Sequence, residues 1–177
     1  MTRHTRVRQL DAASVRRIEA LPLTRPSQDR AAGFRPLSRT ARIGTGVDVF
    51  ARARDDLFAW QIQARAGVRV DASAPTVALG GVAVVSIGLG RVRIGGPVRI
   101  VDVVDRPDRA GFTYAALDGH PEAGEESFHV VLDDRGAVRF ELAGRSKPVS
   151  HLTRIGGPVS TLVQRAVTDR YARALVE

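Results

Sequence analysis

The sequence predicts an α+β fold in which a twisted antiparallel β-sheet grips a long C-terminal helix. Three observations support this class. Apolar residues alternate with polar ones between residues 68 and 142, which is the period of β-strands. The segments between these strands are short, which favours antiparallel neighbours over strand–helix–strand units. After residue 158 the apolar spacing becomes helical, and a helix of about 18 residues would be about 27 Å long, enough to lie across a sheet.

The 177 residues fit one domain preceded by a short extension. We assign residues 1–30 to a basic N-terminal extension with a short helix, whose first nine residues we expect to be loose, and residues 31–177 to a single α+β domain. The chain has no cysteine, so disulfide bonds and thiolate metal sites are excluded. It has no apolar run long enough for a membrane helix and no apolar region typical of a secretory signal. We therefore expect a cytoplasmic protein without a transmembrane segment.

The formal net charge of +8 is concentrated near the N-terminus. Residues 1–43 hold ten arginines against three acidic residues, whereas residues 44–177 hold 17 basic and 16 acidic residues. The core therefore lacks the broad basic face that phosphate backbones require, and we expect no nucleic-acid partner. The basic segment leaves open a contact with an anionic partner or a membrane surface.

In the first half of the chain we expect two helices and a connector. Residues 10–21 carry apolar side chains at helical spacing, with Asp11 or Ser14 as the cap. Residues 22–41 contain three prolines and are expected to be irregular. A second helix is predicted over residues 47–62, where apolar residues recur every three or four positions.

Two features at the ends of this second helix have alternative interpretations. Residues 42–46, Arg-Ile-Gly-Thr-Gly, weakly resemble a phosphate-binding loop, but the Lys-Ser/Thr ending is absent. We prefer the interpretation that the glycines end a short strand and allow the turn into the helix. Trp60, the only tryptophan, either packs in the core or lines a cavity.

The second half is predicted to consist mainly of strands. These are expected at residues 68–70, 76–89, 98–104, 112–117, 127–132 and 138–142. Residues 76–89 form either one buried strand or a hairpin that turns near Gly80 and Gly81. Residues 95–97, Gly-Gly-Pro, are expected to interrupt the sheet, and residues 133–136 to form a tight hairpin turn.

Residues between positions 112 and 128 resemble the signature of a known family, GF-x-YGTLPGHP-x-x-GEE-x-F. The resemblance is carried by Phe112, Thr113, Tyr114, Leu117, Gly119, His120, Pro121, Gly124, Glu125, Glu126, Ser127 and Phe128. The signature belongs to a bacterial and plant family known as domain of unknown function nineteen-ninety. Ala115, Ala116 and Asp118 depart from it.

The order of the expected elements is similar to that of the helix-grip proteins of the SRPBCC superfamily. That superfamily includes START domains, pollen-allergen proteins and polyketide cyclases. The resemblance implies a ligand cavity between the curved sheet and the final helix.

Side chains capable of chemistry gather in the same stretch. His120 and Glu125 are the candidate catalytic residues, as a general base and its orienting carboxylate. The alternative is that Gly-His-Pro forms a turn in which His120 bonds its own loop. Glu125 and Glu126 cannot share one face of a strand, because neighbouring side chains alternate. The spacing of histidines and carboxylates matches no metal motif, and we predict neither a metal nor a cofactor.

Three functions are consistent with the sequence. The first is binding of a small apolar or amphipathic ligand between the sheet and the C-terminal helix, with Tyr114, Trp60, His120 and Phe112 as ligand-binding residues. The alternative is an enzyme of the lyase, cyclase or hydrolase type that uses His120 and Glu125. The third is an interaction protein that uses its basic N-terminal segment on an anionic partner or membrane surface.

Overall fold

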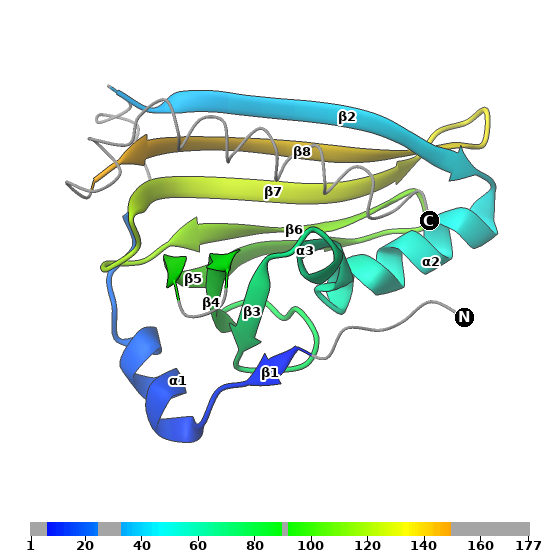
Figure 1. Ribbon diagram of the computed structural model, residues 1–177. Helices are drawn as coiled ribbons and strands as arrows, with labels where there is room; N and C mark the ends of the chain where they lie inside the picture. The colour runs from blue at the N-terminus through cyan, green and yellow to red at the C-terminus, as the bar shows by residue number, and fades with distance from the viewer. Residues whose placement is uncertain (1–6, 25–32, 90–91, 150–177) are drawn as a thin grey trace.

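The computed structural model (Figure 1) describes residues 7–24, 33–89 and 92–149. In these ranges eight strands form one sheet in the order β1-β3-β4-β5-β6-β7-β8-β2. Every neighbouring pair is antiparallel except β1 and β3, which are parallel. The α+β class and the antiparallel sheet are confirmed. The helix expected after residue 158 falls in a part of the chain that the structure does not describe.

The helices and strands have the following bounds. The helices are α1 (Ala12–Glu19), α2 (Val47–Phe58) and α3 (Gln61–Arg65), and the strands are β1 (Arg8–Gln9), β2 (Arg35–Thr45), β3 (Arg69–Ala72), β4 (Val82–Leu89), β5 (Val92–Asp105), β6 (Arg109–Ala116), β7 (Glu122–Leu132) and β8 (Ala137–Pro148). Figure 1 shows α2 and α3 near the end of the sheet where β7 ends, and the start of β7 at the opposite end.

The N-terminal helix begins at one of its two predicted caps. The Asp11 carboxylate accepts a hydrogen bond of 2.8 Å from the backbone N–H of Ser14, which satisfies one of the free N–H groups of the first turn. β1 then pairs with β3, so these two residues, expected to be loose, are part of the sheet. The division into an extension and a domain remains a prediction.

β2 corrects the prediction of an irregular connector over residues 22–41. Arg35–Thr45 pairs with β8 along its whole length and forms one edge of the sheet. An edge strand tolerates Pro36, because on its open side no backbone N–H has to bond a neighbour. The strand ends just before Gly46, and α2 begins at Val47, which confirms the preferred interpretation of residues 42–46.

Three further boundaries differ from the sequence-based expectation. The helix predicted over residues 47–62 is interrupted by Trp60, whose φ of 60° is left-handed. Residues 76–81 belong to a loop, because the strand starts only at Val82. β5 continues through Gly95–Gly96–Pro97 without interruption, since Pro97 still finds Val84 opposite it in β4.

Alternation of side chains divides the sheet into two faces. We call the face that carries Phe112 and Phe128 the inner face, and the opposite one the outer face. α2 packs against β6 and β7 on the inner face. A β-bulge in β5 between Ile100 and Asp102 shifts the alternation, so that Val103 joins Ile100 on the inner face. The bulge therefore changes which side chains of β5 face α2.

Candidate functional site

Four aromatic side chains form a continuous contact series on the inner face, which we call the aromatic row. The Trp60 ring meets Phe112 edge to face with centroids 5.2 Å apart. Phe112 stacks on Phe128 at 5.4 Å, and Tyr114 lies 5.4 Å from Phe128. All four are at most 8% exposed. The structure thus brings together three of the four predicted ligand-binding residues: Trp60, Phe112 and Tyr114.

A carboxyl group stands at one end of the aromatic row. Tyr114 and Glu126 are cross-strand neighbours in β6 and β7, and Tyr114 Oη donates a hydrogen bond of 2.5 Å to Glu126 Oε2. Burial raises the pKa of Glu126, the bond from Tyr114 opposes this, and the charge of Glu122 adds to the increase. Glu126 therefore favours its neutral form more than an ordinary glutamate does.

Glu122 is another carboxyl group on this face, four residues before Glu126 in β7. Burial raises its pKa as well, while a hydrogen bond from the Ser146 side chain opposes that shift. Between the two glutamates stands Gly124, paired with Ser146 and with a φ of 146°. A Cβ on Gly124 would lie 2.0 Å from the Arg145 carbonyl oxygen, so only glycine fits there.

His120 lies in the turn before β7 and is held by its own loop. Its Nδ1 atom is 2.7 Å from the carbonyl oxygen and 3.0 Å from the backbone nitrogen of Glu122. The ring also covers Gly96 of β5, where a Cβ would approach His120 Cα to 2.6 Å. Burial lowers the pKa of His120, which favours the neutral imidazole.

The structure does not bring Glu125 to His120. Glu125 alternates with Glu126 along β7, so its side chain belongs to the outer face, where Arg145 is its neighbour in β8. His129 is on that outer face too, with the Arg109–Glu141 ion pair of 3.2 Å beside it. The carboxyl group that accompanies Tyr114 is therefore Glu126. In the sequence, the signal for this choice is that Glu126 and Phe128 are two residues apart in a strand and therefore lie on the same face.

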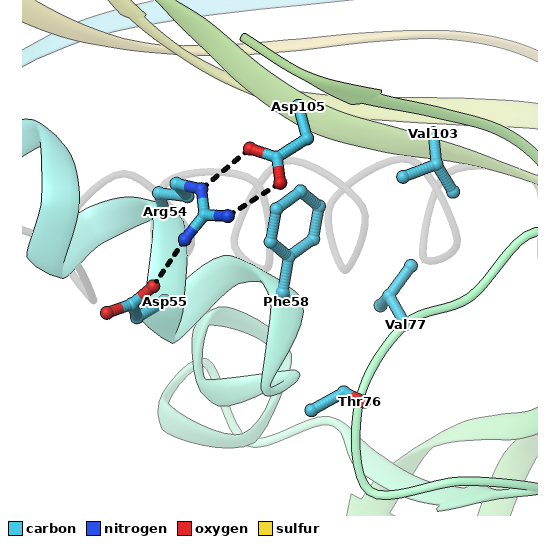
Figure 2. A pocket seen from close by; sticks show the side chains of 7 residues that line it. All are labelled: Arg54, Asp55, Phe58, Thr76, Val77, Val103 and Asp105. Atoms are coloured by element: carbon cyan, nitrogen blue, oxygen red, sulfur yellow. Dashed lines mark hydrogen bonds and ion pairs between the residues drawn. The ribbon is translucent and has the colours of Figure 1, made fainter. Parts of the chain in front are cut away.

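A hollow of about 450 Å³ opens between α2, β5 and the loop that follows β3. Arg54, Asp55, Phe58, Thr76, Val77, Val103 and Asp105 line it. Figure 2 shows the Arg54–Asp105 pair on one side of the Phe58 ring and two valines on the other. The hollow therefore has an apolar side and a charged rim.

The charges of the rim are paired with one another. Arg54 Nε and Nη2 donate to the two oxygens of Asp105 at 2.7 and 2.6 Å, and Nη1 donates to Asp55 at 2.9 Å (Figure 2). This arrangement raises the pKa of Arg54 and lowers the pKa of Asp105. The guanidinium is thus shared by two carboxylates, so the rim has no excess of positive charge.

A second, smaller hollow of about 20 Å³ reaches the aromatic row. It is lined by Trp60 and Ile100 and shares Thr76 and Val77 with the larger hollow. In the described part of the chain, Trp60 Nε1 and both amide atoms of Gln63 are buried without a hydrogen-bond partner. These unpaired groups were not foreseen from the sequence, because they depend on how α3 packs.

Residues 7–24, 33–89 and 92–149 contain neither a metal centre nor a membrane-spanning helix. These ranges hold no group of three histidine, aspartate or glutamate side chains placed to bind a metal ion. None of the helices described is long and apolar enough to span a bilayer.

Solved structures of other proteins share this arrangement of sheet and helices. The chain resembles the ZhuI aromatase/cyclase of Streptomyces sp. R1128 with a TM-score of 0.54 and 11% identity, over 81% of this chain and 92% of that one. A norcoclaurine synthase mutant of Thalictrum flavum has a TM-score of 0.52 and 10% identity, over 81% of this chain and 94% of that one. The major latex-like protein 151 of Panax ginseng has a TM-score of 0.50 and 17% identity, over 82% of this chain and 100% of that one. At these identities the likeness is one of fold.

The chain belongs to the family described as Domain of unknown function (DUF1990), which it matches over residues 18–174. This confirms the family that the signature residues indicate. A UPF0548 protein of Deinococcus radiodurans is 41% identical over 78 residues, which are 44% of this chain and 39% of the relative. A UPF0548 protein of Arabidopsis thaliana is 34% identical over 71 residues, 40% of this chain and 35% of the relative. The matches thus span well under half of these relatives.

Proposed function

We propose that the protein binds a small, mainly apolar molecule against the inner face of its sheet. The observation that carries this proposal is the hollow of about 450 Å³ between α2 and β5. Its volume lies in the range of about 300–1,000 Å³ that is usual for small-molecule sites. Phe58, Val77 and Val103 give it the apolar walls that such a site needs.

Three titratable groups outside the lining of the hollow have pKa values shifted toward their neutral forms. Burial raises the pKa of Glu122 and Glu126 and lowers that of His120, so each keeps its neutral form over a wider pH range than an ordinary side chain of its kind. In its neutral form each of these groups offers hydrogen bonds without attracting ions. None of these three groups lines the hollow, where Arg54 already meets Asp55 and Asp105, so a hydroxyl or carbonyl group on an apolar body suits the hollow better than a carboxylate.

Native mass spectrometry of protein purified from its own host tests for such a ligand. We expect an added mass of a few hundred daltons that disappears on denaturation. Calorimetry with naphthol and naphthoate then compares a neutral and an anionic ligand of one shape, and we expect naphthol to bind more tightly. A preference for naphthoate would contradict the proposal of a neutral ligand.

A matched pair of variants locates the site. Val77→Phe fills the larger hollow and should weaken naphthol binding by about tenfold, since the ligand and the new ring compete for one space. Val131→Phe makes the same change on the outer face of β7 and should leave binding as it is. Equal affinities in the two variants would place the ligand elsewhere.

Acid–base catalysis is a second candidate function, favoured by the Tyr114–Glu126 hydrogen bond. A carboxyl group with a raised pKa beside a phenol is typical of a general acid or base. Here Glu126 takes the place that the sequence assigned to Glu125, and His120 supports the turn. Wild type and Glu126→Gln should be incubated with the copurified ligand; a change of ligand mass in wild type alone supports catalysis, and none in either rejects it.

A further inference from the structure

The indole N–H of Trp60 is an unsatisfied donor in an apolar setting. The side chain is 2% exposed, and its Nε1 atom has no hydrogen-bond partner among the described residues. Burying such a donor is costly, and an unpaired one in a folded protein calls for an explanation. A bound molecule that offers an acceptor atom is one such explanation.

Trp60 lines a small hollow that adjoins the proposed site. Trp60 lines the hollow of about 20 Å³, and Thr76 and Val77 border both this hollow and the larger one. The two spaces therefore share a wall between the charged rim and the aromatic row.

The ring of Trp60 is held in place from two sides. Its backbone is left-handed, with a φ of 60°, at the junction of α2 and α3. Its edge-to-face contact with Phe112 fixes the ring against the sheet. A donor held in this way is preorganised, so a ligand does not have to order it on binding.

We propose that Trp60 Nε1–H donates a hydrogen bond to an acceptor oxygen of the bound molecule. The site then selects an apolar molecule that carries a carbonyl or ether oxygen over a hydrocarbon of the same shape. An anion is not favoured, because the guanidinium of Arg54 already meets Asp55 and Asp105. This inference rests on the proposed function, since it names the polar group of the ligand that the hollow accepts.

Acetylnaphthalene and ethylnaphthalene test the inference, because they differ in one carbonyl oxygen. The chain has a single tryptophan, so its proton–nitrogen correlation spectrum contains one indole signal. We expect acetylnaphthalene to shift that proton downfield and ethylnaphthalene to leave it without a hydrogen-bond shift. If both compounds bind by calorimetry and neither moves the signal downfield, the inference is wrong while the proposed function stands. If neither binds, both are overturned.

Two variants decide which donor the oxygen meets. Wild type should prefer the ketone by about fivefold, the value of one net hydrogen bond, and Trp60→Phe should remove this preference while it keeps an aromatic ring. Tyr114→Phe removes the hydroxyl group at the other end of the aromatic row. A preference that is kept in Trp60→Phe and lost in Tyr114→Phe would place the oxygen at Tyr114 and overturn the inference.

Discussion

Tyr114 Oη and Glu126 Oε2 lie 2.5 Å apart across two neighbouring strands, in a hydrogen bond that the phenol donates. Burial raises the pKa of Glu126, and this bond acts against the increase because it stabilises the charged carboxylate. Tyr114 therefore influences how readily Glu126 holds or releases a proton. The proposed acid–base chemistry depends on this property.

Tyr114→Phe should raise the pKa of Glu126 further, because the carboxylate loses its hydrogen-bond donor. Infrared titration of the carboxyl band measures this, with Glu126→Gln to identify the band. Thr113→Val is the matched control: it removes an outer-face hydroxyl group that bonds Ser127 and should leave the band unchanged. An unaltered pKa in Tyr114→Phe would mean that the phenol does not influence Glu126.

Glu126→Gln should be more stable than wild type near neutral pH. The folded-state pKa of Glu126 lies above its ordinary value of 4.5, so between these two values the folded protein binds more protons than the unfolded chain. The contribution of Glu126 to stability is thus fully present below 4.5 and is lost as the pH rises through the folded-state pKa. Glutamine stays neutral, so the stability gap should widen as the pH rises.

Urea denaturation at a series of pH values measures this gap. Glu125→Gln makes the same change on the outer face of β7 and serves as the matched control. A gap that widens equally in both variants would argue against a special environment for Glu126. His120 contributes with the opposite sign, because its pKa is lowered and its contribution is lost as the pH falls.

Much of the sheet could be predicted from the sequence, because half-buried antiparallel strands alternate apolar and polar residues. β2 was not predicted, because three arginines and Pro36 on an exposed edge mask its alternation of apolar and polar residues. The left-handed conformation of Trp60 was not predicted either, because tryptophan has no preference for left-handed backbone angles. Both features depend on the completed fold, where pairing with β8 and packing on Phe112 stabilise them.

The candidate site could be predicted only in part. The sequence indicates Tyr114, Phe112 and Trp60, and these meet in the aromatic row. The choice between Glu125 and Glu126 needed the strand parity set by Phe128. The role of Asp105 could not be predicted from the sequence, because the bulge after Ile100 places this residue on the inner face, beside α2.

Gln63→Leu should stabilise the protein by about 1–2 kcal/mol. The Gln63 side chain is 0% exposed and neither amide atom has a hydrogen-bond partner in the described ranges, so leucine removes a desolvation cost. Gln61→Leu is the matched control two positions away, because Gln61 Nε2 donates to the Ala59 carbonyl at 3.1 Å. It should cost about 1 kcal/mol. Loss of stability in Gln63→Leu during chemical denaturation would contradict this expectation.

Asp105→Asn and Asp56→Asn should differ in cost and in salt dependence, although both break a bidentate pair with an arginine. The Arg54–Asp105 pair at the rim is 36% and 46% exposed, so its loss should cost about 1 kcal/mol or less and should matter least at high salt. The Arg65–Asp56 pair is 16% and 19% exposed, with bonds of 2.6 and 2.8 Å. Its loss should cost about 2–3 kcal/mol at any salt concentration, because the partner charge is left poorly solvated.

Urea denaturation in low and high salt measures both variants. Equal, salt-independent costs would make the rim pair a structural clamp between α2 and β5, whereas a small, screened cost leaves it free to open when a molecule enters the hollow.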